Sequence, residues 1–294
     1  MRYLNFLLPL LFLPLLRAGA QPSGEAFGTY WYRGLAEINS YQLHQSRYGE
    51  IHEGTAVLIF VTEPFSLSNH VKKEQAGQEE NDQVTVLKLN FTKNFITGIY
   101  PYSMMMSSFV PVSYDTYPDV LKVSATSQEW CGHTFTQINL GNGSYTFREF
   151  SYFEHEGDRT LSFENFWLED ELWQRIRIDP ASLPTGAIRV FPGLLYHRLS
   201  HENPEMKTAV ATLRSYAKGS YSPIPYQSYT LSYANRRLVI YFEREAPYRI
   251  LGWEEEYEGK TTWGKLVQSI NEPYWHQHHN EHRALRETLG LGFN

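Results

Sequence analysis

Residues 37–47 read EINSYQLHQSR and residues 55–62 read TAVLIFVT, and these two stretches decide the fold. In the first, Ile38 and Ser40 fall on the strand face opposite Tyr41 and Leu43. The second is almost continuously apolar, which is typical of a strand buried on both faces. Residues 48–54 (YGEIHEG) lie between them and carry two glycines that permit a chain reversal. The pattern predicts a long β-hairpin with one fully buried strand.

Outward from this hairpin, short strand-like segments fill most of the chain. Aromatic residues make up 15% of the sequence, and they favour pleated, half-buried surfaces. Tight connections such as Gly141-Asn142-Gly143 predict antiparallel neighbours. The further candidate strands are residues 84–90, 97–112, 120–127, 134–140, 145–153, 187–199, 207–216, 226–233, 237–244 and 248–257. We therefore expect a mostly β fold of curved antiparallel sheets, shaped as a half-barrel or barrel.

Two segments have helical rather than strand patterns. Residues 166–178 (FWLEDELWQRIRI) are acidic early and basic late, as the helix dipole favours, and Asp179-Pro180 should end this helix. Its apolar stripe consists of Leu168, Leu172, Trp173 and Ile176. Residues 281–289 predict a short C-terminal helix that Gly290 stops.

The organisation predicted from these patterns has three parts. Residues 1–20 are a signal peptide, residues 21–184 an N-terminal β region with the mid-chain helix, and residues 185–294 a C-terminal β region with the terminal helix. The segment around Pro184 is the candidate boundary. As an alternative, the two β regions form one continuous domain.

The first twenty residues have the layout of a secretory signal. Arg2 is a basic start, residues 6–16 are apolar, and Ala18-Gly19-Ala20 supplies the small residues of a cleavage site. The apolar run is too short for a membrane-spanning helix, which needs about 20 residues. We expect cleavage after Ala20 and a mature chain that is periplasmic or extracellular.

The net charge, the cysteine count and the absence of known motifs argue against several classes of function. The net charge of −6 argues against a nucleic-acid partner, which normally meets a basic face. Cys131 is the single cysteine, so no intramolecular disulfide can form, and such a residue is usually small, buried and apolar. No phosphate loop or dinucleotide fingerprint is present, and no cofactor is expected.

Several strings resemble a group of exported, uncharacterised proteins of Bacteroidota. They are WYRG (31–34), RYGE (47–50), AVLIFVTE (56–63), TGIYPYS (97–103), QEWCGH (128–133), DPASLP (179–184) and GWEE (252–255). Members of that group often carry the label septum formation inhibitor Maf. Maf proteins are cytoplasmic nucleotide pyrophosphatases with a Ser-Pro-Arg-Arg motif, and this chain has no such motif. The resemblance implies an exported lineage and no particular activity.

The segment QEWCGH concentrates reactive side chains. In an extended strand Glu129, Cys131 and His133 would share one face, and a histidine beside a cysteine can raise its thiolate fraction. This predicts a cysteine- and histidine-dependent hydrolase as one alternative. A structural turn is the other interpretation of the same residues.

Three further polar tracts have weaker signals. His278, His279 and His282 have the helical spacing of a zinc clamp, but a solvated tail that binds metal opportunistically is the favoured interpretation. Residues 154–158 (EHEGD) are expected to form an acidic hairpin tip. Residues 253–257 (WEEEY) are expected to form a solvated strand face.

The favoured function is a non-catalytic binding or carrier module of the cell envelope. A concave apolar face would bind a lipid, an acylated protein or a glycan by apolar burial and ring contact, with peripheral membrane contact. The expected lining is Tyr100, Tyr102, Met104, Met106, Phe109 and Trp130. A structural or assembly protein of the envelope is the third alternative.

Overall fold

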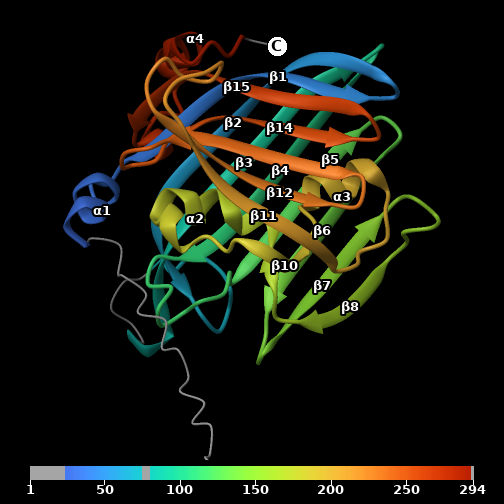
Figure 1. Ribbon diagram of the computed structural model, residues 1–294, viewed down its shortest axis with the longest axis horizontal. Coiled ribbons are helices and arrows are strands. Elements are labelled where there is room, and N and C mark those ends of the chain that lie inside the picture. Colours follow the sequence, from blue (N-terminus) through green and yellow to red (C-terminus); the bar gives the residue numbers. More distant parts are fainter. Residues whose placement is uncertain (1–23, 75–79, 293–294) are drawn as a thin grey trace, which may run out of the picture.

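The computed structural model describes residues 24–74 and 80–292, so the predicted signal peptide lies outside the described residues. In this part of the chain, fifteen strands form one sheet in the order β8-β7-β6-β5-β4-β3-β2-β1-β15-β14-β13-β12-β11-β10-β9 (Figure 1). Neighbours are antiparallel except for the short β9–β10 pair. The mostly β, curved antiparallel fold is therefore confirmed. Strands from both predicted regions belong to the same sheet, because β1 pairs with β15.

The strands are β1 (Ala36–Arg47), β2 (Glu50–Ser66), β3 (Gln83–Thr97), β4 (Tyr100–Pro111), β5 (Lys122–Glu129), β6 (Gly132–Leu140), β7 (Ser144–Ser151), β8 (Arg159–Glu164), β9 (Trp167–Leu168), β10 (Gly186–Phe191), β11 (Lys207–Tyr216), β12 (Tyr226–Tyr233), β13 (Arg236–Glu243), β14 (Ile250–Tyr257) and β15 (Lys260–Glu272). The helices are α1 (Gly24–Trp31), α2 (Leu172–Ile178), α3 (Leu194–Ser200) and α4 (Ala284–Thr288). Short 3₁₀ turns are η1 (Glu80–Asp82), η2 (Glu169–Glu171), η3 (Pro180–Ser182), η4 (Tyr274–His276) and η5 (Asn280–Arg283).

The predicted hairpin is present, with a tighter turn than expected. Arg47 pairs with Glu50, so only Tyr48 and Gly49 form the loop, and both have positive φ, as a type I′ turn requires. The rest of the expected reversal continues β2. Gly54 belongs to this strand, where it pairs with Phe95, and the position requires glycine because a Cβ there would lie 2.2 Å from the Asn94 carbonyl oxygen.

Both faces of β2 are covered, as its apolar run predicts. Ala56, Leu58 and Phe60 belong to the main core. Val57 and Ile59, on the other face, pack in a second cluster that includes Leu289 and Leu291 of the C-terminal segment. The C-terminal segment thus covers the outer side of the central strands.

The sheet curves until its two halves share one core. The indole of Trp253 on β14 lies 5.1 Å from the ring of Phe91 on β3 and 5.7 Å from that of Trp173 on α2. Three strands, β2, β1 and β15, lie between β3 and β14 in the sheet. Figure 1 shows α2 and α3 between the rear strands and the folded-over β10–β12. The interior is therefore filled by side chains and by α2.

The mid-chain helix is shorter than predicted. Residues 167–171 form β9 and η2, because Trp167 and Leu168 pair with the end of β10, and the helix begins only at Leu172. It ends at Ile178, as Asp179-Pro180 predicts. Every residue of α2 is buried, including Arg177, whose guanidinium forms a two-pronged ion pair with Glu37.

The predicted strand over residues 187–199 is wrong in its second half. Pro192-Gly193 ends the β10 ladder, and Leu194 starts α3 with Gly193 as its N-cap. Proline cannot donate to a ladder, so the sheet cannot continue there. At the C-terminus the predicted helix is divided between η5 and α4, and Gly290 follows with positive φ.

Among residues 24–74 and 80–292, no helix has the length and apolar character needed to cross a membrane.

Candidate functional site

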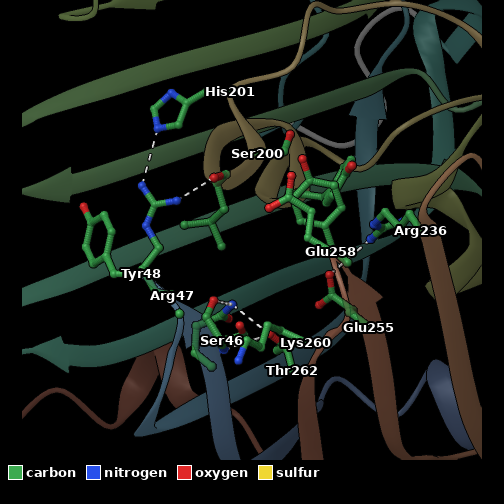
Figure 2. A pocket seen from close by; sticks show the side chains of 15 residues that line it. Ser46, Arg47, Tyr48, Ser200, His201, Arg236, Glu255, Glu258, Lys260 and Thr262 are labelled. Atoms are coloured by element: carbon green, nitrogen blue, oxygen red, sulfur yellow. Dashed lines mark hydrogen bonds and ion pairs between the residues drawn. The ribbon is translucent and has the colours of Figure 1, made fainter.

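A pocket of about 400 Å³ opens where two neighbouring hairpins and the end of α3 meet. One hairpin is the β1–β2 turn at Tyr48-Gly49. The other is the β14–β15 turn at Glu258-Gly259, where both residues again have positive φ. The lining residues are Gln45, Ser46, Arg47, Tyr48, Gly49, Tyr196, Leu199, Ser200, His201, Arg236, Glu255, Tyr257, Glu258, Lys260 and Thr262 (Figure 2).

A buried ion network forms the floor of this pocket. Arg236 on β13 pairs with Glu169 and, at 3.1 Å, with Glu255 on β14. Lys93 on β3 completes the network with its Nζ 2.7 Å from Glu255 Oε1. Burial is the largest single influence on Glu255 and opposes its charge, but Lys93 and Arg236 together lower its pKa to about 2. The floor is thus polar, and Glu255 within it is ionised at neutral pH.

A small cavity continues beneath the floor. Its volume is about 20 Å³, and it shares Tyr196, Arg236 and Glu255 with the pocket above. Asp170 and Gly193 also line it. Such a space is large enough for one water molecule.

Aromatic rings and hydroxyls form the walls. The Tyr196 and Tyr257 rings meet edge to face with centroids 5.2 Å apart. The guanidinium of Arg236 lies 4.1 Å from the Tyr196 ring centroid. Near the base of the β1–β2 turn, Gln45 Nε2 donates to Thr262 Oγ1 at 2.9 Å. The walls therefore combine ring surface with hydrogen-bonding groups.

Arg47 lies on the side of the pocket opposite Arg236 and Glu255 (Figure 2). Its Nη1 donates to the Leu199 carbonyl at 2.6 Å, and its guanidinium lies 4.5 Å from the Tyr48 ring centroid. Its Nη2 is 3.4 Å from His201 Nε2. Among residues 24–74 and 80–292, no carboxylate forms an ion pair with Arg47, and its Nε is buried without a hydrogen-bond partner.

His201 joins Arg47 to a second cluster. Its Nδ1 lies 2.6 Å from Glu156 Oε1, while Arg198 Nη1 lies 3.2 Å from its Nε2. A carboxylate on one side and a guanidinium on the other fit the tautomer with the proton on Nδ1. Burial, chiefly, and the neighbouring arginines lower the pKa of His201, against the opposite influence of Glu156.

His155, Glu156 and His201 also form a three-ligand group whose ligand atoms lie within 4.8 Å of one another. A metal-ligating histidine normally donates its second nitrogen to a carboxylate or carbonyl. Here the second nitrogen of His201 faces two guanidiniums, which have no lone pair to accept that proton. The arrangement therefore favours a hydrogen-bonded cluster over a metal site. Residues 154–158 lie in the connection between the antiparallel strands β7 and β8, as the predicted acidic hairpin tip requires, and Glu156 is buried within it.

The predicted shared face of Glu129, Cys131 and His133 is wrong. Glu129 pairs with Gly132 across a two-residue turn, so Trp130 and Cys131 form the tip of the β5–β6 hairpin. Glu129 points inward to Arg198 at 3.2 Å, whereas His133 is exposed beside Gln128 on the other face. The extended-strand geometry fails because the reversal falls inside the segment.

Cys131 is exposed, contrary to the expectation of a buried residue. Glu129, through a hydrogen bond and its charge, raises the pKa of the Cys131 thiol. A raised pKa reduces the thiolate fraction that nucleophilic catalysis needs.

The predicted ligand-lining residues occupy three different environments. Tyr102, Met104 and Met106 face the main core and are buried. Phe109 faces the other side of β4, where its ring packs on Phe65 with centroids 4.8 Å apart. Tyr100 and Trp130 stack with centroids 6.2 Å apart at the end of the sheet, where Trp130 is largely exposed. They do not line one common cavity in the described part of the molecule.

The C-terminal histidines lie in and around η5. His278 and His279 have ring centroids 4.4 Å apart, and His282 Nδ1 accepts from the His279 backbone N–H. This capping contact gives them a local structural role. Within the described ranges, the three-ligand group is the one at His201.

Sequence reasoning missed the pocket residues Arg47, Tyr48, Tyr196, Arg236, Glu255 and Tyr257 as a set. The segment WEEEY was expected to be solvated, yet Trp253 is fully buried and Glu255 faces the network. Side chains alternate along a strand, so Glu255 lies on the same face as Trp253. This alternation could have predicted from the sequence that Glu255 faces inward.

No family model matches the sequence, and no curated protein matches it. Among solved structures, the chain is similar to the "Beta-barrel-like Protein of Domain of Unknown Function DUF1849 from Brucella abortus", with 11% identity and a TM-score of 0.47. The likeness covers 80% of this chain and 97% of that chain.

Proposed function

We propose that the protein is a non-catalytic binding module whose ligand enters the pocket between the β1–β2 and β14–β15 turns. The observation that carries this proposal is an ionised floor beneath a ring-lined opening of about 400 Å³. Small-molecule sites commonly have volumes of about 300–1,000 Å³ and a few fixed polar groups.

The chemistry of the lining favours a polar, ring-bearing ligand such as a glycan. The walls offer Tyr196 and Tyr257 as ring surfaces, and Ser46 and Thr262 among the polar groups. A sugar presents hydroxyls to such groups and C–H faces to aromatic rings. An acyl ligand has less support than a glycan, because three side chains expected to line an apolar cavity are already buried in the core. They are Tyr102, Met104 and Met106.

The groups in the pocket are poorly arranged for catalysis. Glu255, with a pKa of about 2, holds no proton at neutral pH and is a weak base. The hydroxyl of Ser200 contacts the His197 carbonyl and the Glu202 backbone N–H. Both ring nitrogens of His201 are engaged by Glu156 and Arg198. This supports binding rather than turnover.

The proposal also places the mature chain outside the cytoplasm, on the strength of the leader sequence at residues 1–20. N-terminal sequencing of protein from its own cells tests this part. A start at Gln21 supports it, and an intact leader on cytosolic protein contradicts it.

Binding is tested by titrating a panel of neutral and acidic oligosaccharides, with phospholipid vesicles in parallel, by calorimetry. We expect some oligosaccharides to bind and Tyr257→Ala to weaken them about tenfold. Tyr152→Ala, at an exposed tyrosine outside the pocket lining, is the matched control and should bind like the wild type. Binding of vesicles but no saccharide would overturn the proposal, as would an unchanged affinity in Tyr257→Ala.

A further inference from the structure

We propose that the ligand of this pocket carries an oxyanion, a carboxylate or a phosphate, and that Arg47 binds it. This inference rests on the proposed function and specifies its substrate class as acidic glycans. Its central observation is that Arg47 is a partly buried cation with which no carboxylate of residues 24–74 and 80–292 forms an ion pair.

The other buried cations around the pocket are matched by acidic side chains. Arg236 has Glu169 and Glu255, and Lys93 shares Glu255. Arg198 pairs with Glu129 at 3.2 Å. Arg47 instead contacts the Leu199 carbonyl, His201 and aromatic rings. Removing a charge from water without a counter-ion is unfavourable, so an anion that reaches Arg47 gains affinity.

Hydrogen-bond donors outnumber acceptors at this end of the pocket. Arg47 Nη2 and Arg198 Nη1 both approach His201 Nε2, at 3.4 and 3.2 Å. A neutral imidazole offers one lone pair there, and N–H···O/N bonds are normally near 2.9–3.0 Å. Among the described residues, Arg47 Nε has no acceptor, and the same holds for the Nε atoms of Arg198 and Arg236. An oxyanion has several lone pairs in the geometry that a guanidinium matches.

The charged side chains at the rim of the pocket do not neutralise the positive charge of Arg47. Lys260 and Glu258 are both exposed and lie on either side of Gly259, so salt screens their charges. Glu156 lies on the far side of His201, and its oxygens are held by His201 and Ser151. Arg47 is therefore the partly buried cation of the described pocket lining that a ligand can reach, and Lys260 is an exposed cation at its rim.

The experiment compares matched ligands that differ only in charge: cellobiose, cellobiouronate and cellobiose 6′-phosphate, alongside the panel used above. We expect one acidic form to bind at least tenfold more tightly than cellobiose at low salt, and the advantage to shrink as salt rises. The carboxylate and phosphate arms show which oxyanion is preferred.

Arg47→Gln should remove the preference for the acidic ligand, so that its affinities for the acidic and neutral ligands differ by less than about twofold. Arg244→Gln, at an exposed arginine outside the pocket, is the matched control. Equal binding of neutral and acidic ligands overturns this inference while the proposed function stands. Absence of any saccharide binding overturns both. If Arg47→Gln fails to fold, the preference of the wild-type protein for acidic ligands, and the dependence of that preference on salt, still test the inference.

Discussion

The Nζ atom of Lys93 lies 2.7 Å from Oε1 of Glu255, although 162 positions separate the two residues in the sequence. Lys93 belongs to β3 and Glu255 to β14, strands that do not pair directly. Their contact requires the sheet to curve so that inward side chains of distant strands meet. The same curvature assembles the floor of the proposed binding site.

Lys93→Met should destabilise the fold by about 3–5 kcal/mol, because it leaves Glu255 buried with part of its compensation removed. Urea unfolding followed by tryptophan fluorescence measures the change. Arg237→Gln, which breaks an exposed pair with Glu256, is the control and should cost less than about 1 kcal/mol. Equal effects of the two substitutions would contradict a buried network.

Asp170→Asn should stabilise the protein more at pH 8 than at pH 5. Burial, above all, and the neighbouring Glu169 and Glu255 raise the pKa of Asp170 to about 7 from 3.8. The folded state therefore holds this proton more tightly than the unfolded chain. Stability from this group is complete below pH 3.8 and is lost as pH rises towards 7. The lost stability amounts to a few kcal/mol. The asparagine side chain carries no titratable proton, so the variant should not lose this stability as the pH rises.

Thermal unfolding of wild type and Asp170→Asn between pH 5 and 8 measures this effect. The amide oxygen of Asn can still accept the Leu194 backbone N–H that Asp170 Oδ2 accepts at 2.9 Å. Parallel pH profiles for the two proteins would rule out titration of Asp170 in this range. Glu255 acts in the opposite sense: its stabilisation is present above pH 4.5 and is lost as pH falls towards 2.

Gly264→Ala should cost about 1–3 kcal/mol through overpacking. A Cβ at Gly264 would lie 2.2–2.4 Å from three atoms of the Trp253 ring, which rests on this glycine across the β14–β15 pair. Chemical denaturation measures the loss. In a Trp253→Phe background, Gly264→Ala should cost less stability than it does in the wild type, since the smaller ring leaves room for the new Cβ. Additive effects in this double-mutant cycle would show that the ring and the glycine are uncoupled.

Cys131 should react slowly with iodoacetamide at pH 7 and much faster above pH 9, because Glu129 raises the pKa of its thiol. N-acetylcysteine under the same conditions gives the reference rate. Cys131→Ser should leave stability within about 0.5 kcal/mol and ligand binding unchanged, since the side chain is exposed. Fast labelling at pH 7 would revive the hydrolase alternative.

Much of the fold could be predicted from local patterns. Residues 55–62 are apolar on both faces, and the structure covers both faces of β2. Asp179-Pro180 ends α2, and Gly141-Asn142-Gly143 connects β6 to β7, as predicted. These features depend on neighbouring residues and on backbone geometry, which the sequence states directly.

The limits of the local patterns appear where a turn or a partner lies elsewhere. QEWCGH has the alternation of a strand, but the reversal at Trp130-Cys131 separates Glu129 from His133. WEEEY has the composition of a solvated face, but Lys93 and Arg236 are present to neutralise Glu255 inside. Whether a charge can be buried depends on which opposite charges the fold brings to it.

By itself, the sequence determined the class of the fold, because hydrophobic periodicity and turn residues act over a few positions. Only the tertiary structure decided the site. Arg47, His201, Arg236 and Glu255 come from four separate segments, and sheet curvature gathers them around one pocket. Curvature is a property of fifteen paired strands and of the helix packed inside them, so no single segment of the chain specifies it.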